Sequence, residues 1–188
     1  MIELVNVSAG YGDKLILTDF SATVPLTGTT LVSGPSGVGK TTLLRLLMGL
    51  LRPASGDIRG LDGLRPAVVF QEDRLLPWRT VLDNAALAGE RAAAARSLDA
   101  LGLAEVQNAR PRALSGGMQR RVAIARALAY PGDLLLLDEP FTGLDAESKA
   151  AAARVILARK LPIVLVTHDA EEAALLGAAH VIRLEAKG

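Results

Sequence analysis

The sequence has no cysteine and few aromatic residues, and both shortages exclude classes of functional site. Without cysteine the chain can form no disulfide, no thiolate metal site and no cysteine nucleophile. Aromatic residues make up 3% of the chain, so a platform of stacked rings for single-stranded nucleic acid is not expected. Because hydrophobic residues still form 50% of the chain, the core must consist mainly of aliphatic side chains.

An excess of charge of one sign is also lacking. The 21 basic and 20 acidic residues give a formal net charge of +1, which provides no broad field for nucleic acid or anionic lipid. Any phosphate binding is therefore expected to be local. No uncharged apolar stretch approaches the ~18 residues that a membrane-spanning helix needs, and Glu3 stands where a signal peptide carries basic residues. We expect a protein that is soluble when isolated.

The order of strand and helix patterns predicts an α/β fold. The length of 188 residues suits one domain with a small inserted lobe. Strands are expected at 2–7, 16–24, 29–33, around 58, and at 68–70, 134–137, 162–166 and 180–184. Helices are expected at 39–50, 81–101 with an interruption near Gly89, 115–130, 146–160 and 170–176. These elements predict a mainly parallel central sheet, an N-terminal antiparallel β portion, and a helical subdomain at about 81–130 inserted in a core at about 1–80 and 131–188.

A glycine-rich segment follows the third expected strand and opens the first expected helix. It fits the pattern G-x-x-x-x-G-K-[ST] at every fixed position, which predicts a P-loop NTPase core. Backbone N–H groups and the helix dipole can cradle the phosphates of ATP, Lys40 can add a charge, and Thr41 can offer a hydroxyl to Mg²⁺. The expected cofactor-binding residues of this loop are Gly34, Pro35, Ser36, Gly37, Val38, Gly39, Lys40, Thr41 and Thr42. The loop alone would equally fit a GTPase, a kinase or a motor.

Acidic residues and a histidine follow two apolar strands. Asp138 and Glu139 come directly after four leucines, at the strand end where open α/β sheets bind ligands. We expect Asp138 to hold Mg²⁺ through water and Glu139 to orient the attacking water. His168 follows the next apolar strand and should lie at the same edge, although an isolated histidine can also be structural.

The segment 114–119, with the sequence Leu-Ser-Gly-Gly-Met-Gln, resembles the signature motif of ATP-binding cassette (ABC) ATPases. Ser115 at a helix start, followed by Gly116 and Gly117, leaves N–H groups and a hydroxyl open to a phosphate. An ordinary helix-start turn is the plain alternative. Taken in chain order with the P-loop and the acidic strand end, the motif identifies the chain as similar to the ABC family.

The resemblance implies a role for further residues. Tyr11 resembles the aromatic that stacks on adenine, and Gln71 is similar to the Q-loop glutamine that contacts Mg²⁺ or the attacking water. Asp145 resembles the D-loop acid at the dimer seam, and His168 matches the switch histidine at the γ-phosphate. In this family the signature of one subunit closes over the nucleotide of the other, which implies a homodimer or a paired cassette. The catalytic residues implied are Glu139, His168, Gln71 and Lys40, and the metal ligands are Thr41, Gln71 and Asp138.

The segment 71–81 with the following Asp83-Asn84 looks like importer subunits of the nitrate, sulfonate and taurine type. That branch implies a location at the cytoplasmic face of the cell membrane, transmembrane permease partners, and an extracytoplasmic solute-binding protein acting through the permease. Leu75, Leu76 and Trp78, expected to be exposed, would suit a groove for a coupling helix of the permease, although Trp78 could equally pack within the helical lobe. Segments 52–68 and 87–112 look short, and we expect no C-terminal regulatory domain.

Two other functions compete with a transport ATPase. The signature motif argues against the first, a small-molecule kinase. The second is a non-transport ABC ATPase acting on nucleic acid or ribosomes. Its relatives carry two cassettes, long coiled coils or zinc hooks, and none of these fits 188 residues without cysteine. A near-neutral charge also gives nucleic acid no footprint, so no nucleic-acid partner is expected.

Overall fold

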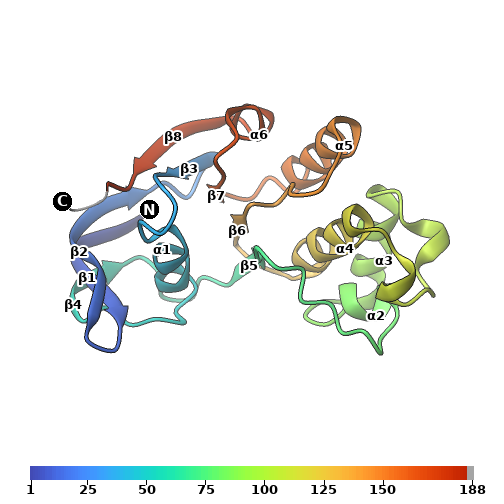
Figure 1. The fold of residues 1–188 in the computed structure, drawn as a ribbon, viewed down its shortest axis with the longest axis horizontal. Helices are drawn as coiled ribbons and strands as arrows, with labels where there is room; N and C mark the ends of the chain where they lie inside the picture. Colours follow the sequence, from blue (N-terminus) through green and yellow to red (C-terminus); the bar gives the residue numbers. More distant parts are fainter. Residues whose placement is uncertain (186–188) are drawn as a thin grey trace.

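The computed structural model describes residues 1–185, in which strands form two sheets on either side of one helix (Figure 1). The antiparallel sheet has the order β2-β1-β4, with β1 at Ile2–Tyr11, β2 at Lys14–Val24 and β4 at Ser55–Arg59. The parallel sheet has the order β5-β6-β7-β3-β8, with β3 at Thr29–Ser33, β5 at Pro66–Val69, β6 at Leu134–Asp138, β7 at Ile163–Val166 and β8 at Ala178–Arg183. The predicted parallel sheet and the N-terminal antiparallel portion are both confirmed.

The leucine run of β6 is buried because both faces of the parallel sheet are covered. Leu134 and Leu136 point into the cluster formed with α1 (Lys40–Leu47) and the antiparallel sheet. Leu135 and Leu137 point to the opposite face, where they pack with the remaining helices. A strand covered on both sides needs a continuous apolar run instead of an alternating one.

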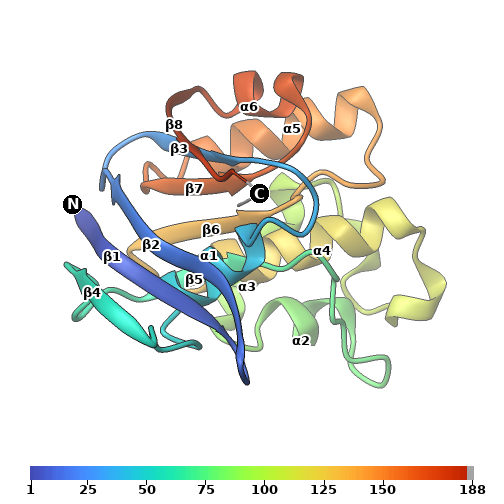
Figure 2. The ribbon, with the colours of Figure 1, turned by 60° about the vertical axis from the view of Figure 1, so that its left-hand side comes forward.

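The other helices pack on the face of the parallel sheet opposite to α1 (Figure 2). Helices α2 (Val81–Ala85), α3 (Arg91–Ala100) and α4 (Gly116–Ala129) pack against one another, while α5 (Ala146–Leu157) and α6 (Ala170–Leu175) precede and follow β7. The predicted interruption near Gly89 is present, since α2 ends at Ala85 and α3 begins at Arg91. A Cβ at Gly89 would lie 2.2 Å from the carbonyl oxygen of Ala129, so only glycine fits there. Two short 3-10 helices, Ala104–Val106 and Pro111–Ala113, were not predicted.

Several predicted boundaries differ from the observed ones. β1 runs four residues further than expected and turns directly into β2 at Gly12, whose φ of 56° suits a tight hairpin. Helix α1 ends at Leu47 instead of residue 50, because Gly49 takes a φ of 69° and closes the helix. Helix α5 ends at Leu157 instead of residue 160.

The register of the parallel sheet brings the predicted motifs to one edge. Asp138 is paired with Val166, Val32 is also paired with Val166, and Val69 is paired with Leu137. The segments that leave these strands therefore start side by side, and they carry the P-loop, Gln71, Glu139 and His168. Within residues 1–185, no helix combines the length and the apolar character that crossing a membrane requires.

Candidate active site

The P-loop wraps the start of α1 in a conformation that two of its glycines make possible. Gly34 has a φ of 151°, and a Cβ there would lie 2.5 Å from the carbonyl oxygen of Leu184. Gly39 has a φ of 115°, and a Cβ would lie 2.9 Å from Cδ2 of Leu17 on β2. Nζ of Lys40 donates hydrogen bonds to the carbonyl oxygens of Gly34 (2.7 Å) and Pro35 (2.8 Å), so its ammonium group lies over the loop.

A cavity of about 280 Å³ opens between this loop and the end of β6. It is lined by Tyr11, Ile16, Ser36, Gly37, Gly39, Lys40, Thr41, Thr42, Gln71, Asp138, Glu139 and Val166. A neighbouring cavity of about 450 Å³ also touches Tyr11, Thr41, Gln71 and Asp138 and extends to Arg45, Phe70 and Arg74. The structure therefore brings together residues that are distant in sequence and that were singled out for nucleotide and metal binding.

The donor atoms in this cavity suit a hard cation. Thr41, Gln71 and Asp138 present a hydroxyl, an amide and a carboxylate, and Mg²⁺ prefers such oxygen ligands together with waters and substrate phosphates. Among the residues described, no group of three or more His, Cys, Asp or Glu side chains could enclose a metal by itself.

Asp138 and Glu139 lie in different surroundings although they are adjacent. Asp138 is 7% exposed, and burial together with the neighbouring charge of Glu139 raises its pKa, while Arg120 and Lys40 act in the opposite direction. Glu139 has a φ of 50°, a left-handed conformation that costs about 1–3 kcal/mol in a residue other than glycine. Its N–H donates to the carbonyl oxygen of Val166 at 2.8 Å. This backbone turn directs the two carboxylates differently.

His168 follows β7 and is joined to Glu139. Its Nδ1 lies 2.9 Å from Oε1 of Glu139, and this contact raises the pKa of the imidazole. Residues on either side of the histidine are tied to α5 and α6: the Thr167 hydroxyl donates to Glu172 at 2.7 Å, and Nζ of Lys149 contacts Asp169 at 3.2 Å and Glu172 at 2.8 Å. The loop that carries His168 is therefore fixed by its neighbours.

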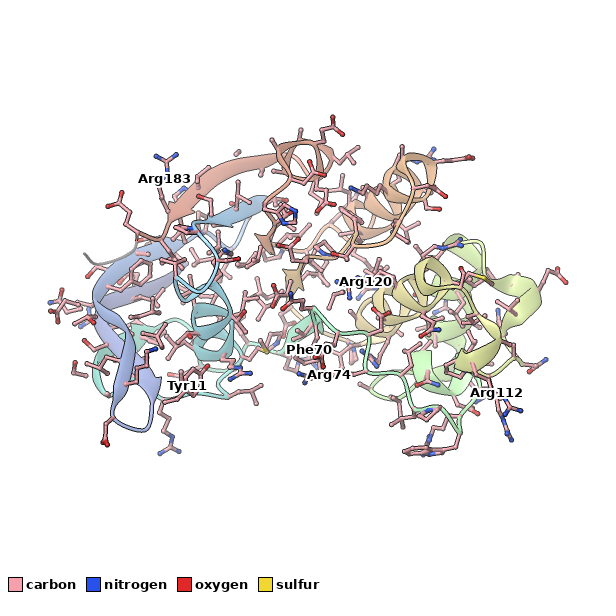
Figure 3. The ribbon with its side chains drawn as sticks, in the orientation of Figure 1. Tyr11, Phe70, Arg74, Arg112, Arg120 and Arg183 are labelled. Atoms are coloured by element: carbon pink, nitrogen blue, oxygen red, sulfur yellow. The ribbon has the colours of Figure 1, made fainter. Side chains whose placement is uncertain are left out.

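Tyr11 lines both cavities, and its ring is partly engaged within the chain. Its hydroxyl accepts a hydrogen bond from Nη1 of Arg45 at 2.9 Å, and the guanidinium carbon of Arg45 lies 5.3 Å from the ring centroid. The residue is 44% exposed, so part of the ring remains open to a ligand. Figure 3 shows Tyr11 beside α1, with Phe70 and Arg74 further along the same side of the molecule.

The predicted signature and D-loop residues do not line the cavity of their own chain. Ser115 and Asp145 are exposed and cap helices: Ser115 Oγ accepts from the N–H of Met118 at 3.3 Å, and Asp145 Oδ1 accepts from the N–H of Ser148 at 2.8 Å. The two segments are close to each other, because a Cβ on Gly117 would lie 3.1 Å from the carbonyl oxygen of Gly143. Neither residue therefore faces the nucleotide cavity of its own chain.

A protein-family model described as ABC transporter matches residues 17–142. The chain belongs to the ABC transporter family. Its P-loop, acidic strand end and signature segment thereby fall within the ATP-binding, ATP-hydrolysing domain of that family.

The relatives of this ABC ATPase include transport proteins. It is 44% identical over 186 residues to "Aliphatic sulfonates import ATP-binding protein SsuB 1" of Rhodococcus jostii (strain RHA1), covering 93% of this chain and 76% of that protein. It is 41% identical over 198 residues to "Aliphatic sulfonates import ATP-binding protein SsuB" of Zymomonas mobilis subsp. mobilis (strain ATCC 31821 / ZM4 / CP4), covering 98% and 82%. Both matches fall in the importer branch that segment 71–84 resembles.

Solved structures of cassettes share the fold. "Dimeric Structure of MJ0796, a Bacterial ABC Transporter Cassette" superimposes with a TM-score of 0.83 at 28% identity, covering 98% of this chain and 94% of that chain. A post-hydrolysis dimer of MJ0796 bound to ADP and Pi gives the same TM-score and identity, covering 100% and 97%. The P-loop ABC ATPase fold of this chain is thereby shown.

One expectation about the segment after Gln71 is wrong in part. Trp78 is 68% exposed, but Leu75 and Leu76 are half-buried, and Leu75 packs against the core. The fully buried Asn84 accounts for Leu76: its Oδ1 accepts from the N–H of Leu76 at 2.7 Å, and its Nδ2 donates to the carbonyl oxygen of Leu76 at 3.1 Å. These bonds draw the chain inward while Trp78 stays outside.

Three residues of this ABC ATPase were missed by sequence reasoning about the site. Arg120 and Lys149 contact the segments that carry Gln71, Glu139 and His168. Asn84 was noticed only as part of a resemblance, without a role. The one signal in the sequence is an arginine among the aliphatic residues of this helix. That signal does not distinguish Arg120 from the adjacent Arg121.

Proposed function

We propose that this chain is the ATP-hydrolysing subunit of a small-solute importer. In this proposal it works as a dimer that encloses two nucleotides and drives separate permease chains. One observation carries the proposal: the P-loop, Gln71, Asp138 and Glu139 share one cavity, whereas Ser115 and Asp145 lie outside it on an exposed surface. Half of each catalytic site must then come from another cassette. The dimeric form named for the MJ0796 cassette supports this arrangement.

The proposed chemistry is hydrolysis at the γ-phosphate. Lys40 and the N–H groups of the P-loop stabilise the charge of the β- and γ-phosphates. Thr41, Asp138 and Gln71 would hold Mg²⁺, which would supply positive charge to neutralise the charge developing on the phosphates. Glu139 accepts a hydrogen bond from a water and holds it in line with the γ-phosphate. His168 is held at Nδ1 by Glu139, so its Nε2 is left to face the γ-phosphate.

The partner cassette completes the site in this proposal. The hydroxyl of Ser115 and the N–H groups at the start of α4 would approach the γ-phosphate of the other subunit, and Asp145 would lie at the seam. Gly116 and Gly117 lack a Cβ, so the backbone of α4 can approach closely. Tyr11 would stack on the adenine with the open part of its ring.

Transport is proposed from the names of the relatives and from the exposed Trp78. The two relatives above are named import ATP-binding proteins for aliphatic sulfonates, so a sulfonate or a similar small anion is the proposed class of solute. A permease helix would dock near Trp78 and Gln71, and a solute-binding protein would act through the permease. This docking surface would lie beside a helical subdomain at about 81–130, which we propose is inserted in a core at about 1–80 and 131–188.

The rate of ATP hydrolysis by the Glu139→Gln variant tests the proposal. The amide keeps the shape of Glu139 but cannot accept a proton, and a positioned base contributes about 10²–10⁴-fold in rate. Turnover should fall by a factor in that range, and ATP should still bind. Because hydrolysis would reopen the dimer, the variant should accumulate as a dimer in ATP but not in ADP, as size-exclusion chromatography with light scattering would show.

Two results would reject parts of the proposal. A Glu139→Gln protein that hydrolyses ATP at the unmodified rate would remove Glu139 from the chemistry. Recovery of ribosomes or nucleic acid, instead of a polytopic membrane protein, in a pull-down from detergent-solubilised membranes would favour the non-transport alternative.

A further inference from the structure

The side chain of Arg120 is buried between the segment that carries Gln71 and the segment that carries Glu139. It extends from α4 toward the segment after β5 that carries Phe70 and toward the end of β6 (Figure 3), and it is 3% exposed. It donates to the carbonyl oxygens of Phe70 (2.7 Å), Gln71 (3.2 Å), Asp138 (3.0 Å), Glu139 and Pro140 (2.9 Å), and to Oδ1 of Asp73 (2.9 Å).

The contacts of Arg120 divide between its nitrogen atoms. Nη1 serves the Gln71 segment alone, whereas Nη2 and Nε serve the Asp138–Pro140 segment alone. A guanidinium group is planar and its donors are rigidly spaced. Its width therefore sets the spacing between the backbone of Gln71 and the backbone of Glu139.

The hydrogen bond to Glu139 bears on a conformation that needs support. Glu139 has a φ of 50°, which persists only where surrounding contacts hold it. Such contacts include the bond from its N–H to the carbonyl oxygen of Val166 and the bonds that its own carbonyl oxygen accepts from Arg120 and from the hydroxyl and N–H of Thr142. Without the bond from Arg120, the left-handed conformation of Glu139 would be less stable, and its carboxylate would move.

A buried charge at this place is costly unless its donors are satisfied. Arg120 has one carboxylate partner, Asp73, and otherwise donates to neutral carbonyl groups of the two segments. Arg126, six residues further along α4, adds bonds to the carbonyl oxygens of Asp73 and Arg74. The Gln71 segment is thus held to α4, the helix that begins beside Ser115.

We propose that Arg120 is a positioning residue for hydrolysis, which holds Gln71 and Glu139 at one fixed spacing and ties both to α4. It does not line the nucleotide cavity, so it acts through Glu139 and Gln71 and not on the phosphates. The inference rests on the proposed role of Glu139 in orienting water.

The first test separates turnover from binding. Arg120→Gln should lower kcat by roughly tenfold to hundredfold, because a displacement of about 1 Å at a catalytic group costs up to about 10²-fold. The Kd for a fluorescent ATP analogue should change by less than about threefold, because the P-loop is untouched. Arg120→Lys keeps the charge but loses the planar, forked arrangement of donors, so its kcat should lie between those of the unmodified protein and Arg120→Gln. Arg121→Gln is the matched control, since this neighbour on α4 bonds the carbonyl oxygen of Leu101 instead, and it should keep kcat within about threefold.

The second test shows whether the effect passes through Glu139. In a Glu139→Gln background, adding Arg120→Gln should lower single-turnover hydrolysis by a smaller factor than in the unmodified protein, because Glu139, one of the two groups that Arg120 positions, has already lost its function. A residue that only supports the fold would lower both backgrounds by the same factor. Asp73→Asn, which keeps the carbonyl contacts, provides a milder variant if Arg120→Gln fails to fold, and its smaller loss of kcat should also be reduced in the Glu139→Gln background.

Two outcomes overturn the inference. The first is an equal loss of kcat and nucleotide affinity in Arg120→Gln, and the second is the same factor in both backgrounds. If Glu139→Gln by itself hydrolyses ATP at the unmodified rate, the proposed function fails instead, whatever Arg120 does.

Discussion

Nδ1 of His168 lies 2.9 Å from Oε1 of Glu139, so the imidazole and the carboxylate share a hydrogen bond at the carboxyl edge of the sheet. The two residues come from the ends of neighbouring parallel strands, β7 and β6. The bond fixes which ring nitrogen remains for a ligand, and it couples the charge of the histidine to that of the proposed base.

The pair predicts a measurable pKa. The carboxylate of Glu139 should hold the pKa of His168 above its ordinary value of about 6.5, and Glu139→Gln should bring it back toward that value. The pair then stabilises the fold fully below about pH 6.5, and this stabilisation is lost as the pH rises through the pKa of the folded state. The contribution is small because the histidine is exposed.

Proton NMR titration of the imidazole resonances measures this pKa. His180 is the one other histidine in the sequence, so a His168→Gln variant assigns the signal. An unchanged His168 titration in Glu139→Gln would mean that the bond is not formed in solution.

The exposed position of Ser115 predicts that it acts on a nucleotide of the other subunit. Ser115→Arg should abolish hydrolysis, by at least about 100-fold, because a bulky cation replaces a phosphate donor at the seam. Nucleotide binding to the monomer should persist, because Ser115 lies outside the cavity of its own chain. Loss of the helix cap should cost about 1 kcal/mol of stability.

Mixing two inactive variants gives the decisive measurement for Ser115. In a dimer of Ser115→Arg with Lys40→Ala, one nucleotide faces an intact P-loop and an intact signature, and the other faces neither. Hydrolysis should therefore return when the two inactive proteins are mixed. Mixtures that stay inactive, although both proteins fold and form dimers, would show that Ser115 does not act across a seam.

Replacing Asn84 is expected to cause a large loss of stability. Its side chain is fully buried and bonds the N–H and carbonyl group of Leu76 and the carbonyl oxygen of Thr80 (2.9 Å). Asn84→Ala leaves these groups without partners, at about 1–3 kcal/mol for each buried group, and should lower the free energy of unfolding by about 2–4 kcal/mol. Urea unfolding measures the change, and the exposed Asn108→Ala is the control. A loss of under about 0.5 kcal/mol would contradict the buried network.

The motifs that could be predicted from the sequence are those in which local pattern and chemistry coincide. The P-loop and the Asp138-Glu139 pair each occupy one short segment at a strand end, and strand ends of a parallel sheet share an edge, so their meeting follows from the fold class. The interruption near Gly89 was likewise visible in the helical pattern.

Arg120 could not be predicted in the same way. It follows Gln119 and precedes Arg121, and the full burial of Arg120, beside a half-buried Arg121, depends on segments about 50 residues earlier and 20 later in the chain. The left-handed backbone of Glu139 and the half-burial of Leu76 also arise from long-range bonds, which leave no local pattern. Such contacts override propensity in ways that spacing does not reveal.

The side chain of Lys149 links α5 to the loop that carries His168. It lies on α5, which Asp145 caps, and its Nζ contacts Asp169 and the buried Glu172 on either side of the α6 start, next to His168. The carboxylates of Glu172 and Asp169 raise the pKa of Lys149.

Lys149→Met removes the positive partner and leaves Glu172, which is 5% exposed, with the Thr167 hydroxyl alone. Breaking a fully buried pair costs about 3–5 kcal/mol, but Lys149 is partly exposed, so a loss of about 1–3 kcal/mol is expected in urea unfolding. Adding Glu172→Gln removes the stranded charge and should restore at least about half of that loss, which distinguishes an uncompensated carboxylate from lost packing of the lysine stem. The exposed Lys14→Met serves as the control for a lysine-to-methionine change. Turnover should fall with the displaced His168 while nucleotide affinity is kept. If the double variant is no more stable than Lys149→Met, the ion pair with Glu172 does not hold this loop.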